Sequence, residues 1–600
     1  MRKSKKVLAL VLAMGMTISA LSACGGGELL PGGGTGSTSG GMGAGVNNVY
    51  NVPGNNKTSI SVWTLDLGPG AEWLHQAAER FAEQNQGAHF ADGKTGVYVE
   101  VDTESSSTVL NNIPSSGINM FFADGAADVY SLAQAGALLD ITDIVTDTTR
   151  EGGSLESNMF GNVAETMKGA DGKYYGLPDC EYYGLPTYNR KIFDREFAYF
   201  AAEDATDKVE YTPQNNKFGT AYLVETLETK KSMGPDGKTG VIDGVDYSLD
   251  DGLPSTVTEF LILMDYLKEQ CQVAPLIISG QYNYYVDYLL SGLMTSIAGA
   301  EQMRNYYNCK GEIEIVTGYT NENLFAGIDY IKKPTTQKVV LNETDGYKGS
   351  YMAAKYYAMA VLEVLQREGY FSTDSDTPTR THLDAVYNLI MENKTQHEES
   401  AILVESTYIY RLAKQTSVFD TYEIITTKQE DNLDIRPMPL PTKMTEVDAD
   451  NEVVFVNMSA SSGFINANIK DNAEILQACK AFMTFLYTEE ELKNFILTTG
   501  TPRAITCDIR GEEYSNLPSY YKHLLALRDN ATGSNILYRG GTTEASREMK
   551  GSLSFGLKKV PFYYKDNCLY LAFSANTRNP DGTYADGTKD AFEALKLAAN

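Results

Sequence analysis

The stretch that decides the fold runs from Asp171 to Phe193 and reads DGKYYGLPDCEYYGLPTYNRKIF. An Asp-Gly pair predicts a turn at its start. Two short extended pieces follow, each closed by a Leu-Pro pair, and a helix start is predicted at the end of the stretch, near Lys191. The pattern therefore predicts a turn, two extended pieces and a helix in quick succession.

The chain before this stretch alternates between strand and helix patterns. Buried strands are predicted at 59–65 and 118–122, with an alternating strand at 97–101 and helices around 73–81 and 126–135. This alternation predicts an α/β fold with a parallel sheet covered by helices on both faces. Ligands of such sheets bind beyond the carboxyl ends of the strands. The residues at those ends are Trp63, Thr64, Asp66 and Asp124.

Further landmarks follow in order along the chain. They are a helix start at 253–260, a strand with a polar and aromatic end at 401–408, a proline-rich strand at 435–441, a strand and helix at 463–487, and the turn TGTPR at 499–503. In this order, and together with 171–193, these segments resemble the family 1 extracellular solute-binding proteins, which are the carbohydrate-binding components of ABC importers. The resemblance covers about residues 60 to 505.

The resemblance implies a two-lobed fold like that of the periplasmic binding proteins. Each lobe would be a sheet covered by helices, with the ligand cleft between the lobes. Residues 58–181 and 459–508 would form lobe 1, and 182–458 and 509–600 would form lobe 2, with hinges near Tyr183 and Ser462. Residues 196–252 depart from the family's usual size and read as an insertion in lobe 2. The tail after Asp508 also departs from it, and we expect it to pack on lobe 2.

The N-terminus predicts export. Four basic residues between Arg2 and Lys6 precede a short apolar stretch, and 1–23 reads as a signal peptide. The run LSAC ending at Cys24 resembles the lipobox of bacterial lipoproteins, in which the Cys thiol receives palmitate-like acyl chains; an ordinary signal peptide with a chance Cys is the alternative. Residues 24–57 read as a Gly/Ser-rich tether. We expect a lipid-anchored protein on the extracellular face of a cell membrane, in a bacterium with a single membrane.

The charge balance excludes some partners. The chain has 50 basic and 78 acidic residues, and without the four signal-peptide cations the balance is 46 against 78, or −32. Such a surface repels nucleic acid. The six cysteines besides Cys24 are not close-spaced, so buried thiols and three disulfides both stay open. The five histidines show no metal-ligand spacing, so we expect no metal. We also expect no cofactor, and we expect the protein to be a monomer.

The aromatic residues suggest the chemistry of the site. The chain has 39 Tyr, 22 Phe and 2 Trp, and tyrosine offers a sugar both an apolar ring and a polar tip. Ordinary packing is the alternative for each of these residues, and we expect packing for Tyr306, Tyr307, Tyr356 and Tyr357. The predicted stacking residues are Trp63, Tyr182, Tyr282 and Tyr408, and Tyr285 is a further predicted substrate-binding residue. The predicted hydroxyl acceptors are Asp66, Asp124, Glu181 and Glu405, and Arg503 is the predicted donor.

The function that the resemblance implies is capture without catalysis. The lobes would close on a sugar or oligosaccharide and deliver it to the permease subunits of an ABC importer. A cell-surface carbohydrate-active enzyme is an alternative, with two carboxylates such as Asp66 and Asp124, but nothing in the sequence fixes such a pair. A sensor lipoprotein of the same fold, which presents its ligand to a signalling partner, is a second alternative.

Overall fold

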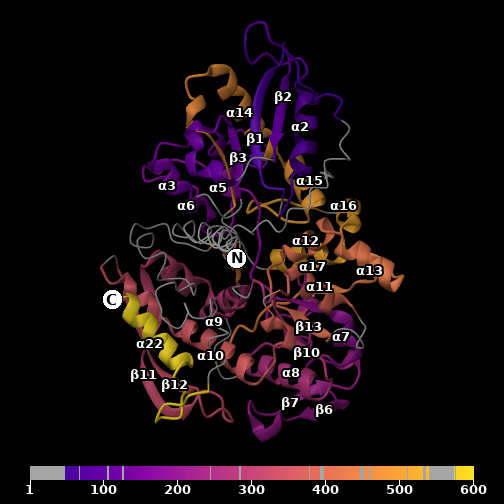
Figure 1. The fold of residues 1–600 in the computed structure, drawn as a ribbon, viewed down its shortest axis with the longest axis vertical. Helices are drawn as coiled ribbons and strands as arrows, with labels where there is room; N and C mark the ends of the chain where they lie inside the picture. The colour runs from indigo at the N-terminus through magenta and orange to yellow at the C-terminus, as the bar shows by residue number, and fades with distance from the viewer. Residues whose placement is uncertain are drawn as a thin grey trace, which may run out of the picture.

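The computed structural model describes residues 48–66, 68–103, 107–123, 128–242, 245–282, 285–342, 344–377, 379–391, 398–445, 452–458, 461–509, 511–530, 535–538, 573 and 576–599. These residues form two lobes along the long axis of the molecule (Figure 1). The predicted signal peptide, Cys24 and Asp124 lie outside the described residues. None of the described helices is both long and apolar enough to cross a bilayer.

Lobe 1 is built on a five-stranded sheet in the order β2-β1-β3-β16-β4. The strands β1 (Thr58–Thr64), β2 (Val97–Asp102) and β3 (Met120–Ala123) are parallel, as the strand–helix alternation predicts. Strand β16 (Ser462–Ile465) comes from far along the chain and lies antiparallel between β3 and β4 (Leu177–Pro178). The sheet of lobe 1 is therefore mixed, and not wholly parallel.

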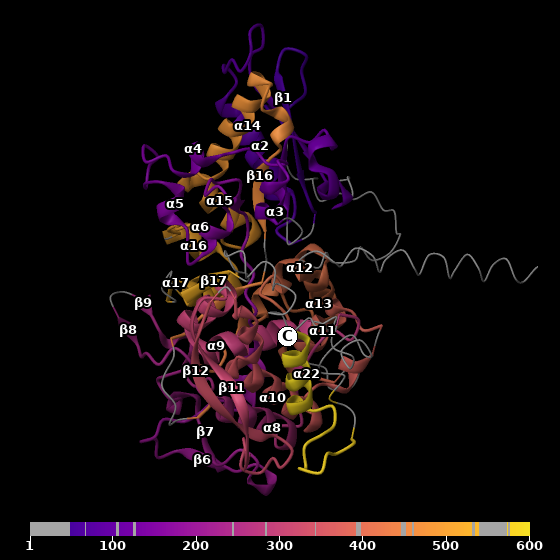
Figure 2. The same cartoon turned by 90° about the vertical axis from the view of Figure 1, so that its left-hand side faces the viewer.

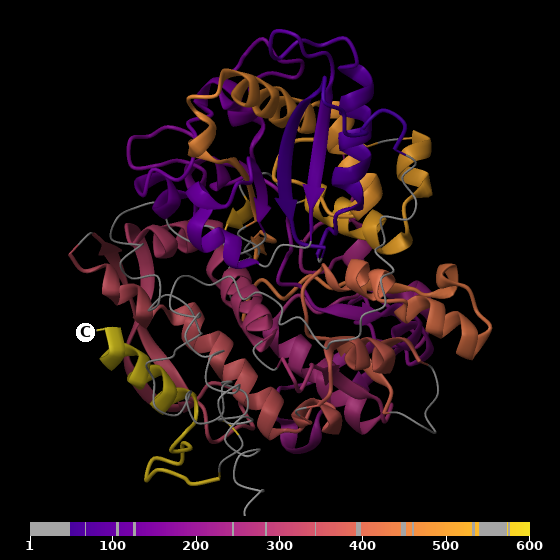
Figure 3. The same ribbon diagram turned by 45° about the horizontal axis from the view of Figure 1, so that its top comes forward.

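Helix α2 (Glu72–Gln84) packs on the core of lobe 1 with the apolar face that the spacing of its residues predicts. Trp73, Ala77 and Phe81 are all buried on that face. Helices α14 (Ala473–Leu486) and α15 (Glu489–Thr499) pack beside α2, and the Phe81 and Phe482 rings lie 4.9 Å apart. Figure 3 shows these orange helices next to the indigo strands. Lobe 1 thus joins residues that are about 400 positions apart.

Lobe 2 contains a four-stranded sheet in the order β10-β13-β5-β14. The strands β10 (Ala274–Ile277) and β13 (Ser400–Leu403) are parallel, and β5 (Thr187–Asn189) is antiparallel to β13 and to β14 (Ile435–Pro437). Helix α8 (Val257–Glu269) covers it and begins where the sequence predicts. Thr256 and Glu259 form a capping box there, which satisfies two of the free amides at the helix start.

Three additions enlarge lobe 2. A long hairpin of β11 (Gly311–Asn323) and β12 (Lys332–Leu341) follows α9 (Val286–Asn308), which bends at Gly299. Helix α22 (Thr588–Ala599) packs on α10 (Ala353–Arg367). The stretch 196–252 contains two strand pairs, β6 (Lys208–Tyr211) with β7 (Ala221–Val224) and β8 (Val241–Ile242) with β9 (Val245–Asp246). The first lies at the lower end of lobe 2 and the second at its left side in Figure 2.

The chain passes between the lobes in three segments that lie side by side. The Met458 amide donates to Tyr182 O at 2.7 Å, and the Glu181 amide donates to Pro502 O at 3.0 Å. Strand β15 (Phe455–Asn457) also pairs with β17 (Ile536–Tyr538). Helix α17 (Ser519–Asn530) then packs on β14. These segments form a hydrogen-bonded junction, so the two lobes are not joined by free linkers.

Candidate functional site

Three separate segments bring polar and aromatic side chains together at the carboxyl ends of β10 and β13. Strand β13 ends at Leu403, two residues before Glu405, and Tyr408 is the N-cap of helix α12 (Ile409–Gln415). Beyond β10 come Tyr282 and then Tyr285, which is the N-cap of α9. Tyr182 reaches the same place from the junction. We call Tyr182, Tyr282, Tyr285, Glu405 and Tyr408 the tyrosine cluster.

Hydrogen bonds connect three members of the tyrosine cluster. The Tyr408 hydroxyl donates to Glu405 Oε1 at 2.7 Å. The Tyr285 and Tyr408 hydroxyl oxygens are 2.8 Å apart. Glu405 Oε2 is buried and has no hydrogen-bond partner among the described residues. The cluster therefore holds one carboxylate oxygen with unused hydrogen-bonding capacity.

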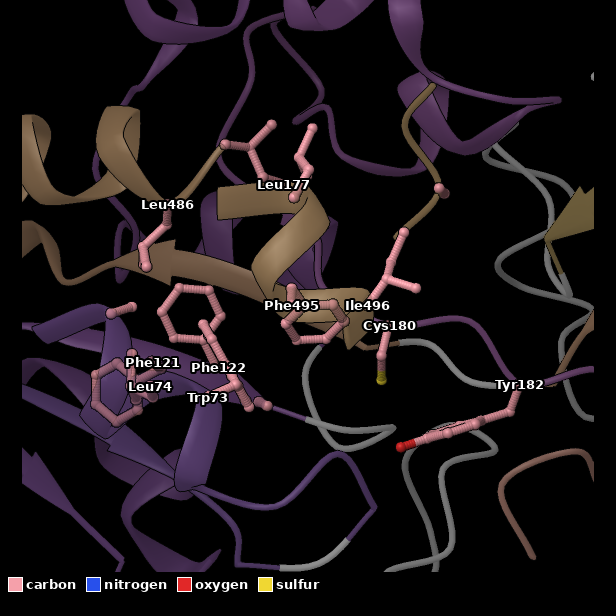
Figure 4. Close-up of a cluster of buried hydrophobic side chains, with 14 of the residues drawn as sticks. Trp73, Leu74, Phe121, Phe122, Leu177, Cys180, Tyr182, Leu486, Phe495 and Ile496 are labelled. Atoms are coloured by element: carbon pink, nitrogen blue, oxygen red, sulfur yellow. The ribbon is translucent and has the colours of Figure 1, made fainter. Parts of the chain in front are cut away.

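Ring contacts hold the rest of the cluster. The Tyr182 ring meets Tyr408 edge to face, with centroids 5.4 Å apart. Tyr282 stacks on His382 at 5.2 Å and lies 5.9 Å from Tyr285. Figure 4 shows Tyr182 at the border of the lobe 1 core, apart from the packed rings of that core. Tyr182 thus belongs to the boundary between the lobes.

Burial governs the charge state of Glu405. Its side chain is 1% exposed, and burial raises the pKa of Glu405 to about 8, while the hydrogen bond from Tyr408 acts in the opposite direction. Burial also raises the pKa of the Tyr408 hydroxyl well above its usual value. At neutral pH the centre of the cluster is therefore uncharged and can both donate and accept hydrogen bonds.

The chain resembles several solved structures. One is the apo form of RafE from Streptococcus pneumoniae, at 12% sequence identity and a TM-score of 0.50, with 91% of this chain and 98% of that chain covered. The two chains share a fold. The expected two-lobed, periplasmic-binding-protein-like α/β fold is thereby confirmed, and at this identity the likeness extends to the fold alone.

Other resemblances are weaker. RafE in complex with raffinose matches at 12% identity and a TM-score of 0.48, covering 90% of this chain and 98% of that one. A sugar transporter from Bacillus licheniformis in complex with stachyose matches at 11% identity and a TM-score of 0.45, covering 90% and 99%. No family model matches the sequence, and no curated protein matches it.

Two of the predicted residues of lobe 1, Trp63 and Asp66, have contacts within that lobe. Trp63 is fully buried in the core of lobe 1, with its ring centroid 6.1 Å from that of Phe121. Asp66 is exposed on the loop before α2, where Oδ1 accepts the Ala71 amide at 3.2 Å. Asp124 lies outside the described residues. For all three, a contact with ligand stays a prediction.

Glu181 and Arg503 are occupied by ion pairs at the junction. Arg503 Nη2 lies 3.3 Å from Asp179 Oδ1, and the guanidinium packs on the Trp73 and Phe495 rings at 4.7 and 4.1 Å. Arg528 Nε donates to Glu181 Oε2 at 2.9 Å. Both predicted residues therefore anchor the junction in this structure, and their role toward a ligand stays a prediction.

The sequence reasoning missed residues that border this region from α12 and α17. Arg411 Nη2 of α12 lies 3.4 Å from Glu72 Oε2 of lobe 1. Gln415, one turn further along α12, lies beside Gly70. The Tyr520 ring of α17 stacks on Tyr410 at 4.9 Å. The four-residue spacing of Arg411 and Gln415 after a predicted strand end was a usable signal, whereas nothing local linked Tyr520 to the site.

A hollow on the surface of the protein lies apart from the tyrosine cluster. This hollow, in lobe 2, is lined mostly by residues near the bend of α9 and the start of β11, including Glu301, Glu312 and Glu314. The bend at Gly299 is 14 residues past Tyr285, or about 20 Å along a helix.

In the described part of the chain no group of His, Cys, Asp and Glu side chains could hold a metal ion. Cys271, Cys309, Cys479 and Cys507 are thiols.

Proposed function

We propose that this chain is a solute-binding protein that captures a sugar or oligosaccharide between its two lobes and delivers it to an ABC importer. The observation that carries the proposal is the tyrosine cluster: side chains from three segments meet at the carboxyl ends of β10 and β13, where open α/β sheets bind ligands. Phenol rings pack on the apolar faces of sugars, and their hydroxyls bond to the sugar hydroxyls.

The fold supports capture more than catalysis. A two-lobed molecule with a junction of three segments can close around a ligand by hinge motion. In the tyrosine cluster Glu405 is the one carboxylate, and it has no second carboxylate beside it to form the pair that glycoside hydrolysis uses; this holds for the described residues. The proposed activity is therefore reversible binding, with the ligand released unchanged.

The first experiment measures binding by residues 25–600 as a soluble protein. A panel of mono-, di-, tri- and tetrasaccharides is screened by thermal shift, and hits are measured by calorimetry. A ligand at 100 times its Kd is expected to add about 2.7 kcal/mol to the free energy of unfolding. Recovery of chemically altered sugar would favour the enzyme alternative over capture.

A matched pair of variants tests the location. Tyr182→Ala removes a ring from the tyrosine cluster and is expected to weaken binding at least tenfold, in line with a stacking contact of about 1.4 kcal/mol or more. Tyr222→Ala removes a half-exposed ring of the insertion and is the control. Equal affinity of the two variants would place the ligand elsewhere.

We further propose that Cys24 carries the lipid anchor and holds the protein on the extracellular face of the cell membrane. The support is the sequence before Cys24 and the Gly/Ser-rich tether after it. Cys24→Ala is expected to abolish labelling by a clickable palmitate analogue. Undiminished labelling of that variant would contradict the anchor site.

A further inference from the structure

Glu405, Tyr408 and Tyr285 form a row of hydrogen-bonding groups inside the tyrosine cluster. The row runs from the end of β13 to the start of α12 and on to the start of α9. Its two links are 2.7 Å, from Tyr408 to Glu405 Oε1, and 2.8 Å, between the two phenol oxygens. A phenol both donates and accepts, so the row can be polarised in either direction.

The surroundings of Glu405 favour its neutral form. Besides the members of the row, the groups that act on it are two phenols, Tyr288 of α9 and Tyr520 of α17. Burial raises the pKa of Glu405, the hydrogen bond from Tyr408 offsets part of that rise, and among the described residues no basic side chain contributes. An ionised Glu405 would leave charge on a buried Oε2 that has no donor.

The protonation state of Glu405 also decides the direction of the hydrogen bonds along the row. An ionised Glu405 can only accept, so Tyr408 must donate to it and can then only accept from its other neighbour. When Glu405 is neutral, a proton on Oε1 can form a hydrogen bond, because Oε1 faces Tyr408. A proton on Oε2 would have no partner among the described residues, so Oε1 is the favoured position. Glu405 then donates to Tyr408, and the Tyr408 hydroxyl hydrogen becomes available to an acceptor, either the Tyr285 oxygen at 2.8 Å or an oxygen of the ligand.

We propose that Glu405, in its protonated form, is a positioning residue that sets the Tyr408 hydroxyl as a hydrogen-bond donor, so that ligand binding at the tyrosine cluster depends on a proton held by Glu405. This inference rests on the proposed function, because it concerns the same site. Glu405 acts through Tyr408, whose ring is 7% exposed, and not by touching the ligand. The cluster therefore suits an uncharged ligand with acceptor oxygens.

The test is the Kd of the best sugar between about pH 6 and pH 9.5, measured on the mature lipid-anchored chain in detergent. For the unchanged protein, Kd is expected to be constant up to about pH 8 and then to rise roughly tenfold per pH unit. Glu405→Gln cannot ionise and is expected to give a Kd that does not vary with pH. Tyr408→Phe removes the hydroxyl through which Glu405 is proposed to act. This variant is expected to bind the sugar more weakly, with a Kd that does not vary with pH.

A control variant tests whether the pH dependence of Kd comes from Glu405 and not from another buried carboxyl group. Asp250→Asn neutralises another buried carboxyl, in the insertion and outside the tyrosine cluster, and should reproduce the pH profile of the unchanged protein. A rise in Kd above pH 8 that persists in Glu405→Gln would overturn the proposal. The same rise persisting in Tyr408→Phe would overturn the action through Tyr408.

A ligand-free measurement separates this inference from the proposed function. Because the pKa of Glu405 is raised from 4.5 to about 8 on folding, the unchanged protein should lose stability relative to Glu405→Gln between those pH values and not above them. If no variant binds any sugar, the proposed function and this coupling both fall. The unfolding profile would then still show whether Glu405 holds the proton.

Discussion

Arg528 and Glu181 meet inside the junction of the two lobes, with Arg528 Nε 2.9 Å from Glu181 Oε2. The same Nε lies 3.1 Å from the Tyr183 hydroxyl, and Arg528 Nη2 donates to Arg503 O at 2.8 Å. Arg528 comes from α17, so a helix packed on lobe 2 holds two segments that lead out of lobe 1. Each partner compensates the cost of burying the other.

Replacement of Arg528 by Met is expected to destabilise the protein by about 3–5 kcal/mol, because it leaves the Glu181 carboxylate buried and unpaired. Lys338→Met is the matched control, since Lys338 pairs with Glu312 at 2.8 Å while both side chains are more than half exposed. The control should change stability by less than about 1 kcal/mol. Urea unfolding measures both, and equal effects would contradict the anchoring role of Arg528.

Gly500 ends α15 with a φ of +69°, and a Cβ at this position would overlap the Tyr521 ring of α17. Gly500→Ala is therefore expected to cost more than about 3 kcal/mol, from backbone strain and from the displaced ring together. Gly511→Ala has a similar φ of +67° but meets no atom within 4 Å, and should cost about 1 kcal/mol. Thermal unfolding compares the two, and a cost for Gly500→Ala as small as that of Gly511→Ala would show that Tyr521 moves freely.

Asp250 lies buried in the insertion, where burial and the neighbouring Asp236 raise the pKa of its carboxyl from 3.8 to about 7. A carboxyl with a raised pKa contributes stability that is complete below pH 3.8 and is lost as the pH rises to about 7. The unchanged protein should thus lose up to about 1.4 kcal/mol per pH unit relative to Asp250→Asn across that window. A constant difference between the two proteins from pH 4 to pH 7 would contradict this charge state.

Glu72 and Arg411 make a contact between the lobes at 3.4 Å, with the Glu72 side chain 45% exposed. An ion pair of this kind is worth less than about 1 kcal/mol, which limits its effect on an open–closed equilibrium to about fivefold. Glu72→Lys is expected to shift the population toward open lobes in single-molecule fluorescence. Glu72→Lys with Arg411→Glu should restore it, and a failure to restore would indicate that the contact does not hold the lobes together.

Local patterns were enough to predict much of the fold. The spacing of Trp73, Ala77 and Phe81 identified the buried face of α2, and the segment at 253–260 identified the start of α8. The polar residues after a buried strand led to Glu405 and Tyr408, because the end of a strand can be recognised from its own sequence. Tyr306 and Tyr356 are buried within helices, as predicted.

The rest depended on partners that are distant in sequence. Glu181 and Arg503 were predicted to face a ligand, and the sequence around them does not reveal that Arg528 and Asp179 are their partners. Nothing in the local sequence of β16 shows that it pairs antiparallel with β3, because the same residue pattern is compatible with either direction. Long-range pairing of this kind is decided by packing, and propensity or periodicity does not encode it.

The place of β16 has a consequence for the order in which the protein is made. A chain that emerges from its N-terminus supplies β14, the last strand of the lobe 2 sheet, by residue 437. The lobe 1 sheet must wait until residue 465, because β16 fills the gap between β3 and β4. Until then β3 presents an unpaired edge of buried apolar residues. Of the two main sheets, the one in the lobe that begins the chain is therefore the last to be finished.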